Sequence, residues 1–196
     1  MSATAWQMLS RGRTGRSVMQ ILTIGHSTHP LMELVQLLRA HQVEQVADVR
    51  TYPGSRRLPW FNREALAREL PPHGLRYVHL PQLGGRRRPS PESPNTAWRV
   101  EGFRGYADHM ASTEFATGLE ALQGLGAEYT TAMMCAEGLW WRCHRRLVSD
   151  ALAVHGWEVV HIGPDGGTTA HELTPFAVAD RGRLTYPPAQ TSLGAG

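Results

Sequence analysis

The 196-residue sequence contains no lysine, so all 20 residues counted as Lys or Arg are arginine. This absence excludes Schiff-base catalysis by a lysine, pyridoxal-phosphate anchoring and the lysine of a P-loop. Two cysteines are too few for a disulfide framework. No apolar run approaches the roughly 20 residues of a membrane-spanning helix. Because no secretory signal is visible either, we expect a cytoplasmic protein with reduced thiols and no membrane partner.

The residues that are present indicate a folded domain. Hydrophobic residues make up 41% and charged residues 19% of the chain, which is too apolar for a disordered protein. We expect a flexible basic extension over residues 1–18, a single domain over 19–180 and a weakly structured tail over 181–196. The net charge of +3 permits an anionic small molecule or nucleic acid as partner. The exclusive use of arginine reflects either a GC-rich genome or the recognition of anions by planar guanidinium groups.

Strand and helix patterns alternate along the chain. Short apolar runs predict five strands, over residues 21–24, 46–49, 75–80, 129–134 and 159–162. Helical spacing predicts helices over residues 30–41, 63–70, about 103–125 in two pieces around Ser112-Thr113, and 143–155. Asn62 is the predicted N-cap of the second helix, and residues 81–99 form a lid, a binding loop or a mobile segment. This alternation predicts an α/β fold with a mostly parallel sheet of about five strands and helices on both faces.

Polar or reactive residues follow every predicted strand. In parallel sheets the ligand site lies outside the carboxyl ends of the strands. The segments found there are Gly25-His26-Ser27, Asp48-Val49-Arg50, His79 to Gly85, Cys135-Ala136-Glu137 and His161-Ile162-Gly163. Any one of these polar residues can merely cap a helix or satisfy a loop, but their convergence predicts a functional cleft.

The segment from Cys135 to Arg146 links a strand to the start of a helix, where free N–H groups and the helix dipole favour anions. Arg142, Arg145 and Arg146 are unfavourable at this positive end. A bound phosphate or carboxylate, or the carboxylates Glu137 and Asp48, would resolve the conflict. The same environment favours a thiolate, so Cys135 or Cys143 is a candidate nucleophile or redox thiol.

Other interpretations of the two cysteines stay open. They could form a reversible disulfide, or join His144 and His26 in a metal site, although their spacing matches no common zinc template. They could also be buried apolar residues. Six residues separate Cys135 from Arg142, one more than the loop of a protein tyrosine phosphatase requires.

A second polar cluster combines Asp48 and Arg50 with the following Pro53, Ser55 and Arg56. Asp48 either orients a histidine or the Arg50 guanidinium for function, or forms an ion pair that stiffens the loop. Ser27 or Thr28 is a candidate cap of the next helix, which leaves His26 as a candidate acid or base.

Two features are compatible with nucleic acid. Arg86, Arg87 and Arg88 form a charge run, most simply a solvated one, and four tryptophans lie in predicted loops: Trp60, Trp98, Trp140 and Trp141. The tryptophan side chains can stack on bases, but packing of the loops onto the sheet is the commoner explanation for them.

The motifs resemble the DUF488 family, whose name records that its function is unassigned. The matching stretches are Thr23 to Ser27, Asp48 to Arg50 with Pro53, Ser55 and Arg56, Tyr77 to Pro81 with Leu83 to Gly85, Cys135 to Glu137 with Cys143 to Arg145, and His161-Ile162. The resemblance runs from about Gln20 to Gly163 and implies a Rossmann-like three-layer sandwich. It implies no reaction and no cofactor.

We therefore expect an enzyme or ligand binder acting on an anionic small molecule, such as a nucleotide or another phosphorylated metabolite. The candidate anion-binding residues are Arg50, Arg56, Ser27, Arg142 and Arg145. The candidate catalytic residues are Cys135 and Cys143 for thiol chemistry, His26 and His144 as acid or base, and Asp48 and Glu137 to orient them. The alternatives are a nucleic-acid-binding module, and a metal-binding protein that uses Cys135, Cys143 and His144.

Overall fold

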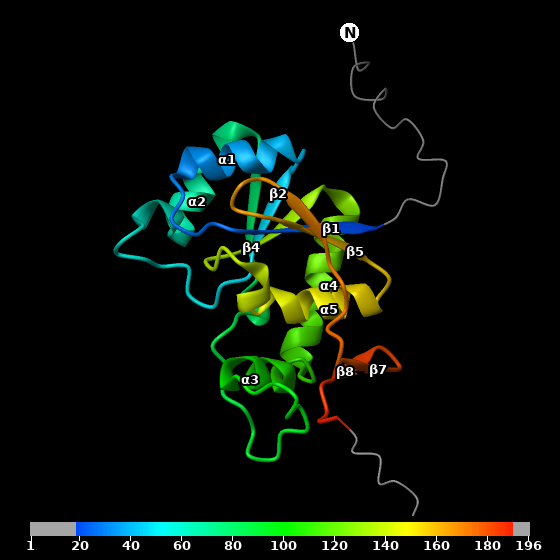
Figure 1. The fold of residues 1–196 in the computed structure, drawn as a ribbon. Coiled ribbons are helices and arrows are strands. Elements are labelled where there is room, and N and C mark those ends of the chain that lie inside the picture. Colours follow the sequence, from blue (N-terminus) through cyan, green and yellow to red (C-terminus); the bar gives the residue numbers. More distant parts are fainter. Residues whose placement is uncertain (1–18, 190–196) are drawn as a thin grey trace, which may run out of the picture.

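A computed structural model describes residues 19–189, and its centre is a six-stranded sheet (Figure 1). The strand order is β3-β2-β4-β1-β5-β6; the first five strands are parallel and β6 is antiparallel to β5. The strands of this sheet are β1 (Gln20–Gly25), β2 (Gln45–Asp48), β3 (Arg76–His79), β4 (Thr131–Cys135), β5 (Glu158–Ile162) and β6 (Thr168–Ala170). The α/β class and the mostly parallel sheet are confirmed.

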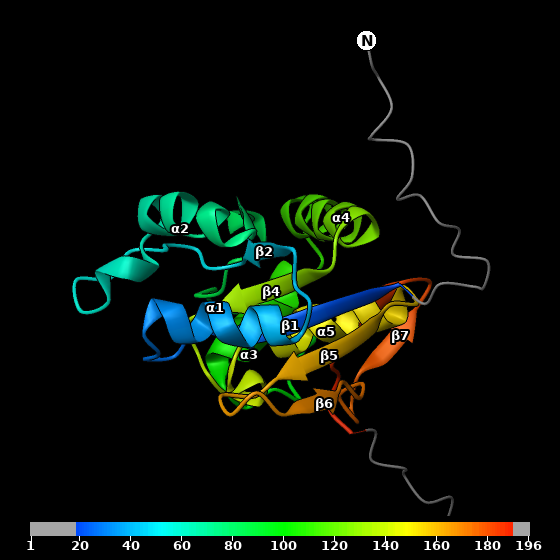
Figure 2. The ribbon, with the colours of Figure 1, turned by 90° about the horizontal axis from the view of Figure 1, so that it is seen from above.

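Helices cover both faces of the sheet, as predicted (Figures 1 and 2). One face packs against α1 (Leu31–Ala40) and α2 (Arg63–Glu69). The other packs against α4 (Thr113–Glu128) and α5 (Arg145–Val154), and α3 (Glu101–His109) packs against α5 on the side away from the sheet. Within residues 19–189, no helix has the length and apolarity needed to cross a bilayer. Short 3-10 turns connect the elements: η1 (Pro59–Phe61), η2 (Pro71–His73), η3 (Pro81–Leu83) and η4 (Trp140–Arg142).

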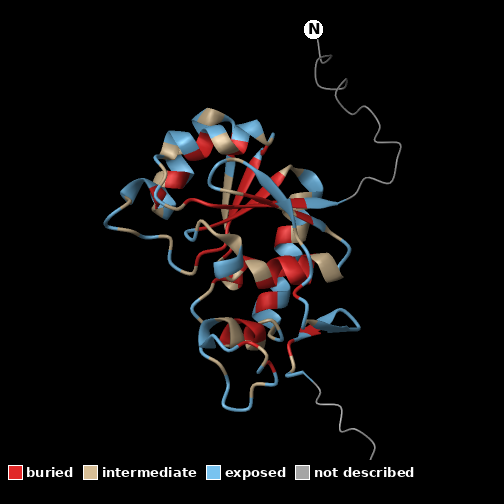
Figure 3. Cartoon of the chain, in the orientation of Figure 1, coloured by how far each residue is buried: buried red, intermediate tan, exposed pale blue. Residues whose placement is uncertain are grey.

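The central strands are buried almost along their whole length because both of their faces are covered. Every residue of β2 and β4 is buried, and so are all residues of β1 after the first. Figure 3 shows this buried centre in red between the two helix layers. The carboxyl ends of β1, β2 and β4 are therefore held rigidly side by side.

Local capping explains some helix boundaries and corrects others. The Ser112 hydroxyl accepts a hydrogen bond from Phe115 N at 3.1 Å, which starts α4 where the break between the two helical pieces was predicted. Asn62 occupies the N-cap position of α2, but its side chain accepts from Ser55 N at 2.6 Å instead of capping the helix. Neither Ser27 nor Thr28 caps α1, whose N-cap position is taken by Pro30 without a side-chain hydrogen bond.

The sheet and the ordered chain extend further than the sequence pattern indicated. A sixth strand, β6, is added at the β5 edge, and β7 (Val178–Asp180) pairs with β8 (Arg183–Thr185) as a separate hairpin. Leu184 and Tyr186 are buried, so ordered structure continues past residue 180, where a weak tail was expected. The expected basic extension over residues 1–18 lies outside the described residues.

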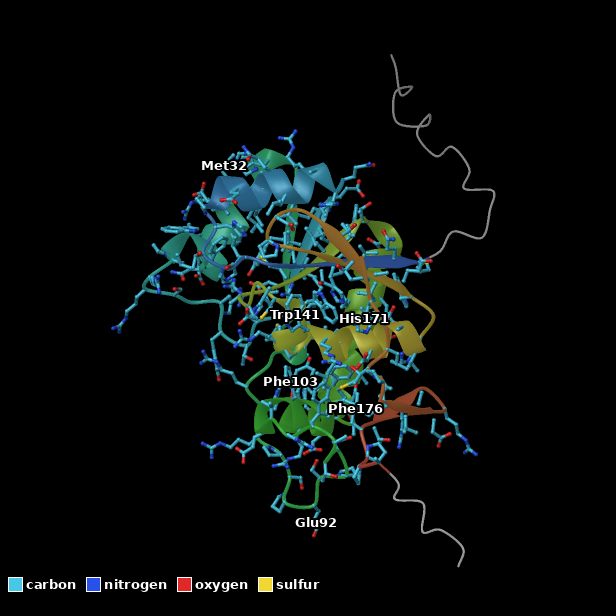
Figure 4. All side chains as sticks on the ribbon, in the orientation of Figure 1. Met32, Glu92, Phe103, Trp141, His171 and Phe176 are labelled. Carbon is cyan, nitrogen blue, oxygen red and sulfur yellow. The ribbon has the colours of Figure 1, made fainter. Side chains whose placement is uncertain are left out.

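The long segment 81–99 is tied to the body of the domain at its end. Trp98 is buried and packs against Phe103 and Phe176, with ring centroids 4.9 Å apart in both cases. Figure 4 labels Phe103 and Phe176 below α5, and Glu92 in the loop beyond them. Asn95 donates to Asp108 Oδ1 at 2.8 Å. These contacts pack the end of the segment against α3 and the C-terminal part of the domain.

Candidate functional site

Three strands deliver polar residues to one edge of the sheet. Gly25 at the end of β1 pairs in register with Cys135 at the end of β4, and Asp48 at the end of β2 lies opposite Met134. This proximity depends on a close backbone approach at Gly25, where an added Cβ would collide with the Glu137 carbonyl. The carboxyl edge is thus a compact place where the loops after β1, β2 and β4 meet.

Cys135, Cys143 and His144 form a cluster at this edge. The Cys135 and Cys143 sulfurs lie 3.9 Å and 3.6 Å from His144 Nδ1. The two sulfurs and this nitrogen all lie within 4.8 Å of one another. Both cysteines are free thiols, exposed by only 7% and 5%. The loop through η4 folds back so that Cys143, eight positions along the chain, returns beside the end of β4.

A backbone carbonyl fixes the orientation of the His144 ring. His144 Nε2 lies 3.1 Å from Val49 O, just after β2. Because a carbonyl only accepts, Nε2 carries the hydrogen, and in the neutral imidazole the Nδ1 lone pair faces both sulfurs. The His144 side chain therefore presents a free electron pair to the two thiols.

The two thiols differ in acidity. The hydrogen bond from the Cys135 thiol lowers the pKa of Cys143 well below its usual range, against the effect of burial and with help from the nearby Arg145 charge. The same hydrogen bond, together with burial, raises the pKa of Cys135. Cys143 is therefore the more acidic thiol of the pair, and Cys135 is its hydrogen-bond donor.

Asp48 and Arg50 form a buried ion pair beneath this cluster. Arg50 donates from Nε to Asp48 Oδ1 at 2.8 Å and from Nη2 to Oδ2 at 2.6 Å. Tyr77 also donates to Asp48 Oδ2 at 2.8 Å, which helps to raise the pKa of the Tyr77 phenol alongside the larger effect of burial. Asp48 itself is fully buried. Its carboxylate holds the Arg50 guanidinium in place through two hydrogen bonds, an arrangement compatible with both roles left open for this pair.

His26 is engaged at both ring nitrogens. Its Nδ1 donates to Ser27 O at 2.9 Å, and its Nε2 accepts from Arg50 Nη1 at 3.1 Å. The ring stacks on Phe61 with centroids 4.0 Å apart. Burial and the Arg50 charge lower the pKa of His26 to about 4. The structure does not bring this side chain to the cysteine cluster; His26 supports Arg50 instead.

Arg145 is fully buried under the loop between β4 and α5, which contains η4. Its Nη2 donates to the backbone carbonyls of Glu137 and Gly138, while Nε and Nη1 have no partner among residues 19–189. The conflict of a cation at the positive start of α5 is thus met by loop carbonyls rather than by a carboxylate. The Glu137 carboxylate is exposed and accepts from Leu139 N at 3.2 Å. Arg145 holds the loop that carries Cys143.

A pocket of about 630 Å³ opens over the cluster. Among the predicted site residues its lining includes Arg50, Arg142, Glu137, Cys135, Cys143 and His144, whereas Ser27, Arg56, Arg145, His26 and Asp48 do not line it. Other lining residues were not among the predicted site residues, for example Thr51, Tyr52, Arg86 and Phe103. Arg86 belonged to a run that looked merely solvated; the preceding Gly84-Gly85 was the available signal.

The family model described as Domain of unknown function DUF488 matches residues 30–152, more than half of the chain. The chain belongs to the DUF488 family. The resemblance inferred from the sequence motifs is thereby confirmed. No curated protein and no solved structure matches the chain. The family assignment covers both cysteines and His144, and it names no ligand and no activity for this DUF488 domain.

The DUF488 domain also contains a buried polar chain that the sequence did not reveal. Thr23 donates to His161 Nδ1 at 2.7 Å, and His161 Nε2 to His171 Nδ1 at 3.0 Å. His171 Nε2 then donates to Asp150 Oδ1 at 2.9 Å, and Tyr186 OH to Asp150 Oδ2 at 2.8 Å. We call these five residues the histidine chain. It links β1, β5 and α5 to the C-terminal segment.

The four loop tryptophans have different environments in the DUF488 domain. Trp98 is buried, and Trp140 stacks on His161 with ring centroids 3.9 Å apart. Trp60 and Trp141 are 37% and 48% exposed. Two of the four tryptophan rings considered for base stacking, those of Trp98 and Trp140, are therefore already packed against other residues of the protein.

Proposed function

We propose that this DUF488 protein is an enzyme that acts on an anionic small molecule, such as a nucleotide or another phosphorylated metabolite. One observation carries the proposal: Arg50, Arg86 and Arg142 line the same pocket as the Cys135–Cys143–His144 cluster. The pocket volume of about 630 Å³ is in the range of small-molecule sites. Positive charge and reactive groups thus share one ligand-sized space.

The three arginines have different roles in this proposal. Arg142 and Arg86 are exposed, and neither has an ion-pair partner within residues 19–189, so their guanidinium groups are free to bind phosphate or carboxylate oxygens. Arg50 is held by Asp48 and His26 and supplies a fixed positive charge at the wall. Cys135, Cys143 and His144 are the reacting centre, and the exposed Glu137 carboxylate lies at the same pocket.

A thermal-shift measurement tests the anion-binding part. Inorganic phosphate and AMP should raise the melting temperature, because ligands that bind only the native state stabilise it, while uncharged adenosine should not. Arg142→Gln and Arg86→Gln should each weaken phosphate binding by at least about tenfold, since a charge-assisted hydrogen bond is lost. Arg39→Gln, an exposed arginine on α1, is the matched control and should bind phosphate normally.

Turnover tests the enzymatic part. The protein is incubated with phosphorylated metabolites, and product formation is followed by mass spectrometry. Conversion that disappears in the double variant Cys135→Ser/Cys143→Ser supports the proposal. Steeply salt-dependent binding of oligonucleotides, without stabilisation by phosphate or AMP, would instead identify the nucleic-acid-binding alternative.

A further inference from the structure

We infer that Cys135, Cys143 and His144 bind a divalent transition-metal ion of the zinc type, with one coordination position open to the pocket. The inference concerns the same cluster as the proposed function, and only the catalytic use of the metal rests on that function. Binding of the ion itself is argued from the three side chains and tested independently of any substrate.

The separations of the donor atoms suit a tetrahedral metal. Metal–sulfur bonds of about 2.3 Å and metal–nitrogen bonds of about 2.0–2.1 Å place sulfur and nitrogen about 3.6 Å apart around one ion. The observed distances to His144 Nδ1 are 3.6 Å from Cys143 and 3.9 Å from Cys135. All three donors lie within 4.8 Å of one another, so an ion can bind with small side-chain adjustments.

The histidine is oriented as a ligating histidine usually is. Such a residue donates its second ring nitrogen to a carbonyl or carboxylate, which fixes the tautomer and aims the other nitrogen at the metal. His144 Nε2 makes this contact with Val49 O at 3.1 Å. The carbonyl comes from the loop after β2, so a neighbouring strand fixes the ring independently of the two cysteines.

The surroundings leave space for a fourth ligand. All three donor residues line the pocket. The backbone of Gly85 borders the cluster, where an added Cβ would lie 2.8 Å from His144 Nδ1. Three protein ligands with one open position are typical of catalytic rather than structural zinc sites. Two thiolates also balance the charge of a dication, so the buried site gains no net charge from metal binding.

The open position suits the proposed substrate class. It would accept water or an oxygen of the anionic substrate, and a metal there supplies Lewis-acid chemistry. The arginines that line the same pocket would bind the anionic oxygens of the substrate that do not contact the metal.

Metal analysis of the full-length protein tests the inference directly. Elemental analysis should find about one zinc-type ion per chain. After chelation, Co²⁺ should restore binding and show thiolate-to-cobalt charge-transfer bands with the intense visible bands of a tetrahedral site. Cys135→Ser, Cys143→Ser and His144→Gln should each weaken Co²⁺ binding more than the about 10–100-fold lost when an outer-shell partner is removed. His155→Gln, an exposed histidine just after α5, is the matched control and should bind normally.

Alkylation of the unsubstituted protein keeps the test decisive if a variant fails to fold. Zinc should protect both cysteines from iodoacetamide, and chelation should remove that protection. The inference would be overturned if the protein held no stoichiometric metal, showed no cobalt charge-transfer band and was alkylated at Cys143 at a rate that zinc does not slow. Cys135 and Cys143 would then be free cysteines. A Cys135–Cys143 disulfide in the protein as purified, with no metal bound after reduction, would overturn it as well.

The outcome is distinguishable from failure of the proposed function. Arg142→Gln should bind Co²⁺ like the unsubstituted protein while losing stabilisation by phosphate. A normal cobalt spectrum with no anion binding would therefore contradict the proposed function alone. Phosphate binding without cobalt binding would contradict the metal site alone.

Discussion

His144 follows η4 closely in the chain and His161 of the histidine chain stacks on Trp140 of η4, but the hydrogen bonding of His144 and of the histidine chain differs in one respect. His144 has one ring nitrogen fixed by Val49 O, while the other faces two sulfurs and a pocket. His161 and His171 use both of their ring nitrogens within the histidine chain. A histidine with a spare, aimed electron pair can perform chemistry, whereas one with both nitrogens satisfied holds segments together. The position of a histidine after a strand does not distinguish the two cases.

The largest expected effect comes from cutting the histidine chain at Asp150. Asp150→Ala leaves the buried donors of His171, Thr174 and Tyr186 without their acceptor, and each such loss costs about 1–3 kcal/mol. We expect the free energy of unfolding to fall by at least about 3 kcal/mol in urea denaturation. Asp180→Asn, an exposed carboxylate in β7, should change it by less than about 0.5 kcal/mol. A similar small change for Asp150→Ala would show that the chain is not a structural element.

A second substitution probes the close backbone contact between the end of β1 and the loop after β4, which carries Cys135 into the cluster. Gly25→Ala would drive a methyl group into the Glu137 carbonyl. Overpacking of this kind costs about 1–3 kcal/mol, and the displaced 136–138 loop should also weaken Co²⁺ binding at the cluster. Gly102→Ala, where the added Cβ meets nothing within 4 Å, is the control. Normal stability and normal cobalt binding in Gly25→Ala would show that this close approach is dispensable.

Acid should destabilise the protein through the histidine chain. Burial and the charges of His171 and Arg145 lower the pKa of His161 to about 3, with Thr23 and the Trp140 ring also facing its imidazole. Between pH 6.5 and about 3 the unfolded state therefore binds a proton that the native state does not. The free energy of unfolding should fall in that window as pH falls, by up to about 1.4 kcal/mol per pH unit from this residue.

Denaturation curves at several pH values check this expectation. His161→Gln should be less stable than the unsubstituted protein at pH 7, yet show a shallower loss towards acid, because the shifted group has been removed. His155→Gln should keep the original slope. An unchanged slope in His161→Gln would mean that another group, such as the buried His26, carries the pH dependence.

The smallest expected effect on stability is at His144. In chelated, metal-free protein, His144→Gln loses the hydrogen bond to Val49 O, worth about 1 kcal/mol. His144→Gln should therefore lower the free energy of unfolding much less than Asp150→Ala does, while it abolishes tight Co²⁺ binding. A large loss of stability in the metal-free state would assign His144 the same structural role as His161.

Much of the fold was predictable because its signals are local. The break before α4 depends on a serine cap at Ser112, and the five parallel strands are short apolar runs between helical patterns. The strands β6 to β8 carry few buried residues and no such pattern, since each is three residues long and mostly exposed. Their positions depend on pairing with other segments rather than on their own sequence.

The candidate site was predictable as a place and less so as a set of contacts. The strand-end rule indicated where Cys135 and Arg50 meet, because parallel strands end at one edge of a sheet. The rule predicted that His26 acts as an acid or base and that Arg145 binds an anion. In the structure both ring nitrogens of His26 are hydrogen-bonded, to Ser27 and Arg50, and Arg145 is buried under the loop after β4. Arg86 reaches the pocket from a run that was interpreted as solvated.

The sequence by itself determined the α/β class, the order of most elements, the family and the edge of the sheet at which reactive residues gather. These follow from the periodicity of apolar residues and from short motifs, which act over a few residues. The tertiary structure alone decided which histidine keeps a free nitrogen, which arginine faces the pocket and how Cys143 returns to Cys135. Those choices depend on carbonyls and side chains distant in the chain, such as Val49 for His144 and Asp150 for His171.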